Sequence, residues 1–159
     1  MNVREAPLPD ESEALYDVLE SLPLMDDLFL RMQAQNIAMV NAHIIDVEKA
    51  MYRQYMEEER TPVPQALFTS ALSQMWIFAL YELLRMWRQR VQEMLVHGKQ
   101  FVAGQVQATV IPAEPDHTTN LPFLHARARA ERDQEFLKQM REARDLIEMP
   151  YRELEGVRV

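Results

Sequence analysis

The chain has 159 residues, which is enough for one domain with a real hydrophobic core. Hydrophobic residues make up 48% and charged residues 26%, so the composition excludes a disordered or fibrous protein. The absence of cysteine excludes disulfides, thiol catalysis and thiolate metal sites. The net charge of −8 comes entirely from residues 1–60, and such a chain lacks the broad basic face of proteins that coat duplex nucleic acid.

The composition favours helix along the whole chain. There are only three glycines, helix-forming residues are abundant, and nine prolines mark the expected boundaries. We therefore expect a single all-α domain over residues 1–159. The first ten residues lack the basic and then apolar pattern of a secretion signal, so we expect a cytoplasmic protein.

The first predicted helix is short and spans about residues 10–21, where Asp10 and Glu13 have the spacing of a capping box and Pro23 follows. A second, long helix spans about residues 25–60. Apolar residues recur in it every seven positions, which is typical of a helix that packs along another long helix. These residues are Leu30, Ile37, Ile44 and Met51.

A row of methionines runs beside this seam, at Met25, Met32 and Met39. Methionine fills irregular gaps in cores and also lines adaptable docking surfaces. The row therefore indicates either core filling or a docking groove for another protein.

A central helix is predicted over about residues 63–97, with apolar residues on nearly every side, as in a buried helix. Its main apolar stripe lies within about 60° of one line. The stripe consists of Leu72, Trp76, Leu80, Leu83, Trp87, Val91 and Met94. Polar residues, including Glu82 and Arg85, interrupt the run before the roughly 20 apolar residues that a bilayer requires, so we expect no membrane partner.

The link between these two long helices, residues 61–64, is too short for anything but an antiparallel hairpin, about 50 Å long. Gly98 is a natural residue to follow a helix C-terminus. We therefore expect His97 in the last turn, where the helix dipole favours its protonated form.

Residues 99–120 form the one long irregular connection, with alternating polar and apolar residues at 105–110 that are consistent with a short extended piece. The connection is either functional or a strap laid over the hairpin. A third long helix is predicted from about 121, after an Asn120 cap, to 149, where Pro150 ends it. Its arginines form either a solvated face or the second wall of a basic cleft; they are Arg127, Arg129 and Arg132.

Arg90 and His97 are the main candidate functional residues. They lie seven residues apart on one side of the central helix, and the earlier positions on that side are apolar. Inward-facing polar groups must be paired, solvated in a cleft or used. Glu93 has the spacing to neutralise both residues. Alternatively, His97 acts as general base on a ribose 2′-hydroxyl while Arg90 stabilises charge on the phosphate, without a metal or cofactor.

An all-helical chain with an arginine, six intervening residues and a histidine near the end of a long helix resembles the HEPN superfamily of ribonucleases and toxins. The motif here is Arg90, VQEMLV and His97. The resemblance implies a metal-independent endoribonuclease acting as a toxin or defence effector, whose homodimer lines one cleft with both copies of the motif. Further basic residues near the motif are expected to position phosphate; they are Arg85, Arg88 and Lys99.

The alternative is a non-enzymatic helical oligomer that docks another protein, such as an antitoxin, through its acidic N-terminal part and its methionine row. The two functions differ in what they require of Arg90 and His97. Catalysis needs them accessible in a basic cleft, whereas an interaction module permits them to be buried and paired.

Overall fold

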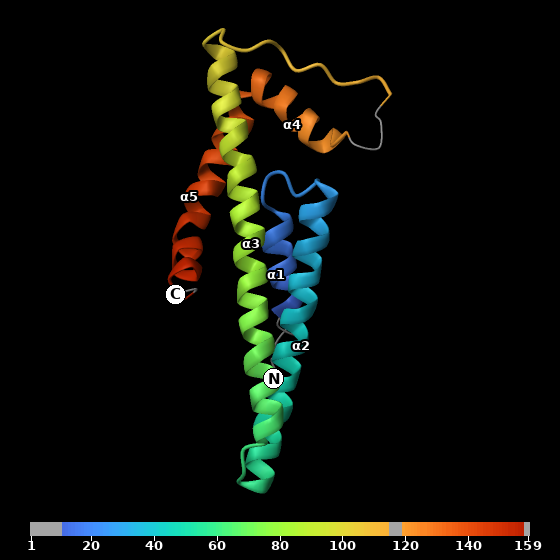
Figure 1. The fold of residues 1–159 in the computed structure, drawn as a ribbon, viewed down its shortest axis with the longest axis vertical. Coiled ribbons are helices and arrows are strands. Elements are labelled where there is room, and N and C mark those ends of the chain that lie inside the picture. The colour runs from blue at the N-terminus through green and yellow to red at the C-terminus, as the bar shows by residue number, and fades with distance from the viewer. Residues whose placement is uncertain (1–10, 115–118, 158–159) are drawn as a thin grey trace, which may run out of the picture.

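The computed structural model describes residues 11–114 and 119–157 (Figure 1). The helices in these ranges are α1 (Glu11–Glu20), α2 (Leu28–Glu58), α3 (Val63–Val102), α4 (Leu121–Arg132) and α5 (Gln134–Val157). No strand occurs within the described ranges, and the expected all-α fold is confirmed. The predicted capping residue Asp10 lies outside them.

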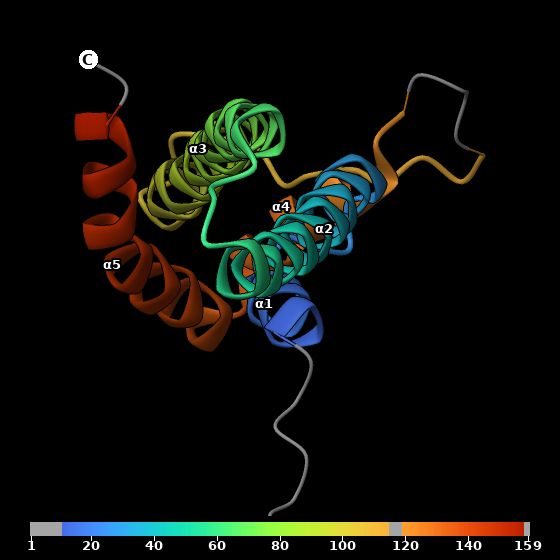
Figure 2. The same ribbon diagram turned by 90° about the horizontal axis from the view of Figure 1, so that it is seen from below.

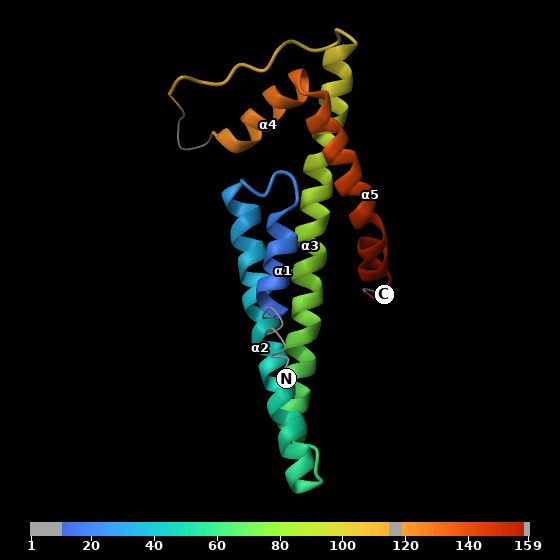
Figure 3. The ribbon, with the colours of Figure 1, turned by 180° about the vertical axis from the view of Figure 1, so that it is seen from behind.

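The long antiparallel hairpin is formed by α2 and α3 (Figures 1 and 3). Helix α2 begins three residues later than predicted because Asp27 caps it, accepting hydrogen bonds from the backbone N–H groups of Phe29 and Leu30 at 3.0 and 3.1 Å. It ends where Glu59 turns left-handed, at φ 52°. The predicted seam is buried at Leu30, Ile37 and Ile44.

Helix α3 does not end at Gly98 but continues to Val102. A Cβ at Gly98 would lie 3.0 Å from the carbonyl oxygen of Ala130 and 2.9 Å from Leu137 Cδ1. The glycine is therefore needed for close packing of α3 against α4 and α5, and not as a helix stop. The prediction that His97 lies in the last turn is wrong.

The core surrounds the half of α3 that runs from Tyr81 to Val102, which we call the body half. Leu83, Trp87, Val91 and Met94 of the predicted stripe have no exposed surface. The indole N–H of Trp87 donates to the carbonyl oxygen of Pro23 at 2.7 Å, which holds the turn between α1 and α2 on the core. Figure 2 shows α5 beside α3 and α1 beside α2, so these helices cover the hairpin from two sides.

The predicted third helix is two helices. Asp133 has an extended backbone, and its carboxylate accepts from the backbone N–H of Phe136 at 3.0 Å, so it ends α4 and caps α5. Pro150 does not end α5, which runs on to Val157. Beyond the proline, Tyr151 stacks on Tyr81 with ring centroids 5.2 Å apart, and this packing outweighs the local cost of proline in a helix.

The connection from α3 to α4 begins at residue 103 and crosses over α4 (Figure 1). We call its described residues 103–114 the strap. The predicted extended piece at residues 105–110 forms no strand. The strap is attached at Thr109, whose backbone N–H donates to Glu131 Oε1 at 2.6 Å.

The other half of α3, from Val63 to Leu80, projects beyond α4 and α5 with α2 beside it (Figure 1). We call it the tip half. Thr69 is its only buried residue, so the prediction of a helix buried along its length holds for the body half alone. The methionine row is likewise split, because Met25 is buried whereas Met32 and Met39 are more than half exposed, and core filling does not explain these two.

Candidate functional site

His97 lies where α3, α4 and the strap meet. Because Gly98 lets α4 approach the backbone of α3, Glu131 of α4 reaches the histidine ring. Both side chains are buried, and the side chain of Glu131 has no exposed surface. This is the most buried cluster of ionisable groups among the described residues.

Three side chains contact the two ring nitrogens of His97. Glu131 Oε1 lies 3.0 Å from Nε2, and the Thr109 hydroxyl lies 3.3 Å from the same atom. On the other side of the ring, Nη2 of Arg127 lies 3.0 Å from Nδ1. The histidine is therefore held between a carboxylate and a guanidinium.

These contacts assign the tautomer of His97. A guanidinium is always protonated and has no acceptor, so Arg127 must donate and Nδ1 must accept. The ring proton then sits on Nε2 and is donated to Glu131. This arrangement requires a neutral ring, in contrast to the protonated form expected from a position in the last turn.

Glu131 stays ionised in this environment. Burial alone would raise the pKa of its carboxyl, but hydrogen bonds from Thr109 and His97 outweigh the burial and lower the pKa. Its second oxygen, Oε2, is buried without a hydrogen-bond partner among the described residues, as is Nε of Arg127. Buried charges that lack some of their hydrogen bonds lower the stability of the folded protein, so stability does not account for this cluster. This favours a functional role for it.

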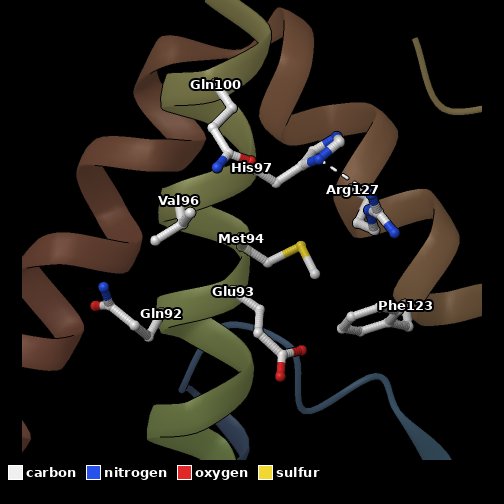
Figure 4. Close-up of a pocket in the computed structure, with 8 residues that line it drawn as sticks. All are labelled: Gln92, Glu93, Met94, Val96, His97, Gln100, Phe123 and Arg127. Carbon is white, nitrogen blue, oxygen red and sulfur yellow. Dashed lines mark hydrogen bonds between the residues drawn. The ribbon is translucent and has the colours of Figure 1, made fainter. Parts of the chain in front are cut away.

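Two members of the cluster, His97 and Arg127, line a pocket of about 420 Å³ (Figure 4). Figure 4 shows His97 pointing from α3 toward Arg127 of α4, with Phe123 of α4 and Glu93 of α3 nearby. Gln92 and Gln100 add amide groups to the lining. Arg127, which contacts Nδ1, lines this pocket together with His97, whereas Glu131, which contacts Nε2, does not.

Arg90 lines a neighbouring pocket of about 320 Å³, which shares Glu93 and Phe123 with the first. Its guanidinium pairs with Asp27 Oδ2 at 2.6 Å, and the same oxygen accepts from the Asn120 side chain at 2.7 Å. Asp27 and Asn120 cap α2 and α4. Arg90 therefore ties the starts of two helices to α3, which is a structural role.

The same contacts lower the pKa of Asp27. Burial raises it, but the hydrogen bonds from Asn120 and the backbone N–H of Leu30, together with the charge of Arg90, have the larger combined effect. Glu93, which the sequence suggested as the partner of both Arg90 and His97, instead accepts from Gln89 at 3.4 Å.

The predicted phosphate-binding residues are not brought together. Arg88 pairs with Glu148 at 2.6 Å and lies over the ring of Tyr151. Arg85 pairs with Glu82 at 2.8 Å, about three turns of helix from His97. Lys99 is exposed near the end of α3. Of the predicted basic residues, Arg127 alone contacts His97.

Glu131 and Thr109 were missed by the sequence reasoning. Arg127 and Glu131 are four residues apart on one helical face, and this spacing was the available signal. It was hidden because the segment reads as a solvated, charged helix. The partner role of Thr109 depends on the path of the strap, which no local pattern specifies.

No protein-family model matches the chain, and neither the curated proteins nor the solved structures include a match. Among the described residues, α3 is the one helix long and apolar enough to cross a membrane by length and composition, and 22% of the relevant window is buried in the protein. A single helix of this kind is weak evidence of a membrane span, because core helices and signal sequences pass the same test.

Proposed function

We propose that this protein is a metal-independent endoribonuclease whose general base is His97. The observation that carries the proposal is the neutral imidazole that donates from one nitrogen to a buried carboxylate and accepts from Arg127 at the other, with His97 and Arg127 both lining a pocket. A base oriented by a second group in this way is the common arrangement of acid–base catalysts. The resemblance to HEPN ribonucleases supports RNA as the substrate.

In this proposal Arg127 takes the phosphate role that the sequence assigned to Arg90. An anionic phosphate in the pocket attracts the guanidinium, whose Nε has no other partner among the described residues. As Arg127 turns toward the phosphate, Nδ1 of His97 is released. Glu131 keeps the ring in place and stabilises the imidazolium that forms.

The reaction then needs only these groups. His97 Nδ1 takes the proton of the ribose 2′-hydroxyl, and the 2′-oxygen attacks the adjacent phosphorus. The bond from phosphorus to the 5′-oxygen breaks, and that oxygen takes a proton from water. The hydroxide that remains takes the proton held by His97, which returns the imidazole to its neutral form. The products are a 2′,3′-cyclic phosphate and a 5′-hydroxyl. All three side chains come from one chain, so each protomer contains a complete site.

The test is cleavage of a mixed RNA pool in excess EDTA. We expect the wild type to cleave and to leave 2′,3′-cyclic phosphate ends, and His97→Ala and Arg127→Ala to lose at least about 100-fold in rate. Arg90→Ala, assayed at a temperature where circular dichroism shows it folded, should retain the activity. Intact RNA with the folded wild type, or equal cleavage by His97→Ala, would rule the proposal out.

A second function is supported by a different observation. Met39 is 65% exposed and lines a groove of about 640 Å³ between α1 and α2, together with Glu13, Tyr16 and Asp17. An acidic groove with an exposed methionine fits a basic amphipathic helix of a protein partner. If the protein is such a module, Glu13→Lys with Asp17→Lys should abolish binding of a basic amphipathic peptide, and His97→Ala should leave it unchanged.

A further inference from the structure

The outer face of α3, opposite its buried stripe, changes character halfway along the helix. In the tip half most exposed positions on this face are apolar, among them Leu67, Ala71 and Phe78, and Gln74 is the polar one. In the body half the same line continues with Arg85, Gln89 and Gln92. The outer face of α3 is therefore polar in the body half, as expected of a solvent-exposed face, and largely apolar in the tip half.

The tip half carries an unusual amount of apolar surface. From Thr61 to Tyr81 there is no charged residue in 21 positions. Five large apolar side chains in this stretch are 49 to 68% exposed, and we call them the outer stripe; they are Val63, Leu67, Phe68, Met75 and Phe78. Three side chains of α2 that are 48 to 65% exposed lie at the same end of the hairpin; they are Tyr52, Tyr55 and Met56.

The exposed surface is large enough for a stable interface. The five side chains of the outer stripe, each about half exposed or more, present roughly 100 Å² apiece. Together they offer about 500 Å² on each copy, so a pair buries about 1,000 Å², which is the lower limit for a specific interface. The largest apolar patch on a typical monomeric protein has about this size and is often functional.

The charges around the outer stripe favour a second copy of this chain as its partner. The stripe is uncharged, so two copies meet without like charges in contact. The end of the hairpin has Glu57, Glu58 and Glu59 against Arg60, which are acidic overall, whereas Glu82 and Arg85 beyond the other end of the stripe pair with each other at 2.8 Å and are neutral together. An antiparallel pair keeps the acidic ends apart and places each one beside this neutral pair, whereas a parallel pair brings the two acidic ends together.

We propose that two copies of this protein associate through the outer stripes of α3, antiparallel and with the two-fold axis near Ala71. Ala71 is the middle residue of the uncharged stretch, so this register gives the longest overlap, about 30 Å. Phe68, Ala71, Met75 and Phe78 follow the alternating three- and four-residue spacing of a coiled-coil seam. The small side chain of Ala71 allows close approach at the axis.

This interface separates the two His97 sites. His97 lies 26 residues from Ala71 along α3, so the two sites are about 80 Å apart in the pair. The arrangement differs from the shared cleft that the HEPN resemblance implies. It stands independently of the proposed function, because it depends on residues that do not contribute to the His97 pocket.

The first experiment measures the oligomeric state of the full chain by sedimentation at micromolar concentration. We expect the wild type at twice the chain mass of 18.7 kDa. Met75→Glu with Phe78→Glu should sediment at the chain mass with unchanged helical content. Leu146→Glu, which alters a side chain of α5 that is 73% exposed outside the stripe, is the matched control and should remain dimeric. A monomeric wild type, or a dimeric double variant, would overturn the proposal.

The second experiment tests the register, and the absence of native cysteine gives it a clean background. Under mild oxidation Ala71→Cys should form a disulfide-linked dimer, because the two residues face each other at the axis. Val63→Cys should not, since its two copies lie about 24 Å apart along the helices. Equal cross-linking of both variants would indicate a parallel pair and would contradict the proposal. A wild-type monomer that floats with anionic lipid vesicles would also contradict it.

Discussion

Gly98 offers a sharp test of the packing that brings α4 onto α3. In an exposed helix interior, glycine to alanine stabilises a protein by about 1 kcal/mol. Here the added Cβ would lie 3.0 Å from the Ala130 carbonyl oxygen and within 3.0 Å of both Leu137 methyl groups. A backbone oxygen cannot rotate away, and Leu137 is 2% exposed, so the clash must be relieved by moving helices.

Overpacking of this kind costs about 1 to 3 kcal/mol. After the helix-propensity gain, we expect Gly98→Ala to be destabilised by about 1 to 2 kcal/mol, which lowers the melting temperature by about 2 to 8 °C for a chain of this size. The measurement is thermal unfolding followed by circular dichroism. A more detailed consequence is reduced protection of the Thr109 amide from hydrogen exchange, because shifting α4 moves Glu131.

The other glycines provide matched controls. Gly156 lies in α5, where an added Cβ would meet nothing within 4 Å, so Gly156→Ala should be neutral or slightly stabilising. Gly104 has φ +70° and open space around it, so Gly104→Ala should cost about 1 kcal/mol through backbone strain alone. If Gly98→Ala is as stable as the wild type, α4 does not approach α3 as described.

Three further changes test the junctions around the site. Asp27→Ala removes a helix cap and leaves Arg90 unpaired, so we expect a loss of about 3 kcal/mol in urea unfolding; a loss under about 1 kcal/mol would contradict the junction. Asp27→Asn keeps the cap but not the charge. Because the folded-state pKa of Asp27 is lowered, the charge of Asp27 stabilises the fold fully above the unfolded pKa of about 3.9, and this stabilisation is lost as the pH falls through the folded value. The difference in unfolding free energy between Asp27→Asn and the wild type should therefore shrink in acid. A difference that stays constant with pH would show that Asp27 is not ionised. Glu131→Gln should cost about 2 kcal/mol and abolish hydrogen-exchange protection of Thr109, and retained protection would show that the strap is held elsewhere.

The hairpin was predictable because its signals are local and repeat. The seven-residue spacing of Leu30, Ile37 and Ile44 and the stripe through Trp87 follow from helix geometry alone. The seam is buried at these three residues, and the stripe is fully buried from Leu83 to Met94. The helix ends predicted at Gly98 and Pro150 were wrong for the same reason. Glycine and proline both disfavour a helix interior, and at these two positions tertiary packing overrides that preference. Boundaries at such residues depend on what packs against them.

The partners of Arg90 and His97 were not predictable from their own helix. Glu93 has the right spacing on α3, but Asp27 and Glu131 come from distant parts of the chain and are brought close by the folding of α2 and α4 onto α3. Pairing within a helix can be read from spacing, whereas pairing between helices requires their arrangement. The exposed outer stripe was missed because an apolar sequence does not distinguish a helix buried in a core from a helix with an exposed apolar face.

The proposed function depends on a neutral His97 whose Nδ1 is free of a proton and is released by Arg127 to an anion. The most direct measurement is nitrogen NMR of protein with ¹⁵N-labelled histidine, with the His97 signals identified by their loss in His97→Gln. At neutral pH the proton should be on Nε2, and a 2′-deoxy oligonucleotide, which binds without being cleaved, should shift the Nδ1 resonance as Arg127 leaves it. A proton on Nδ1, or an Nδ1 resonance that saturating oligonucleotide leaves unchanged, would contradict the account.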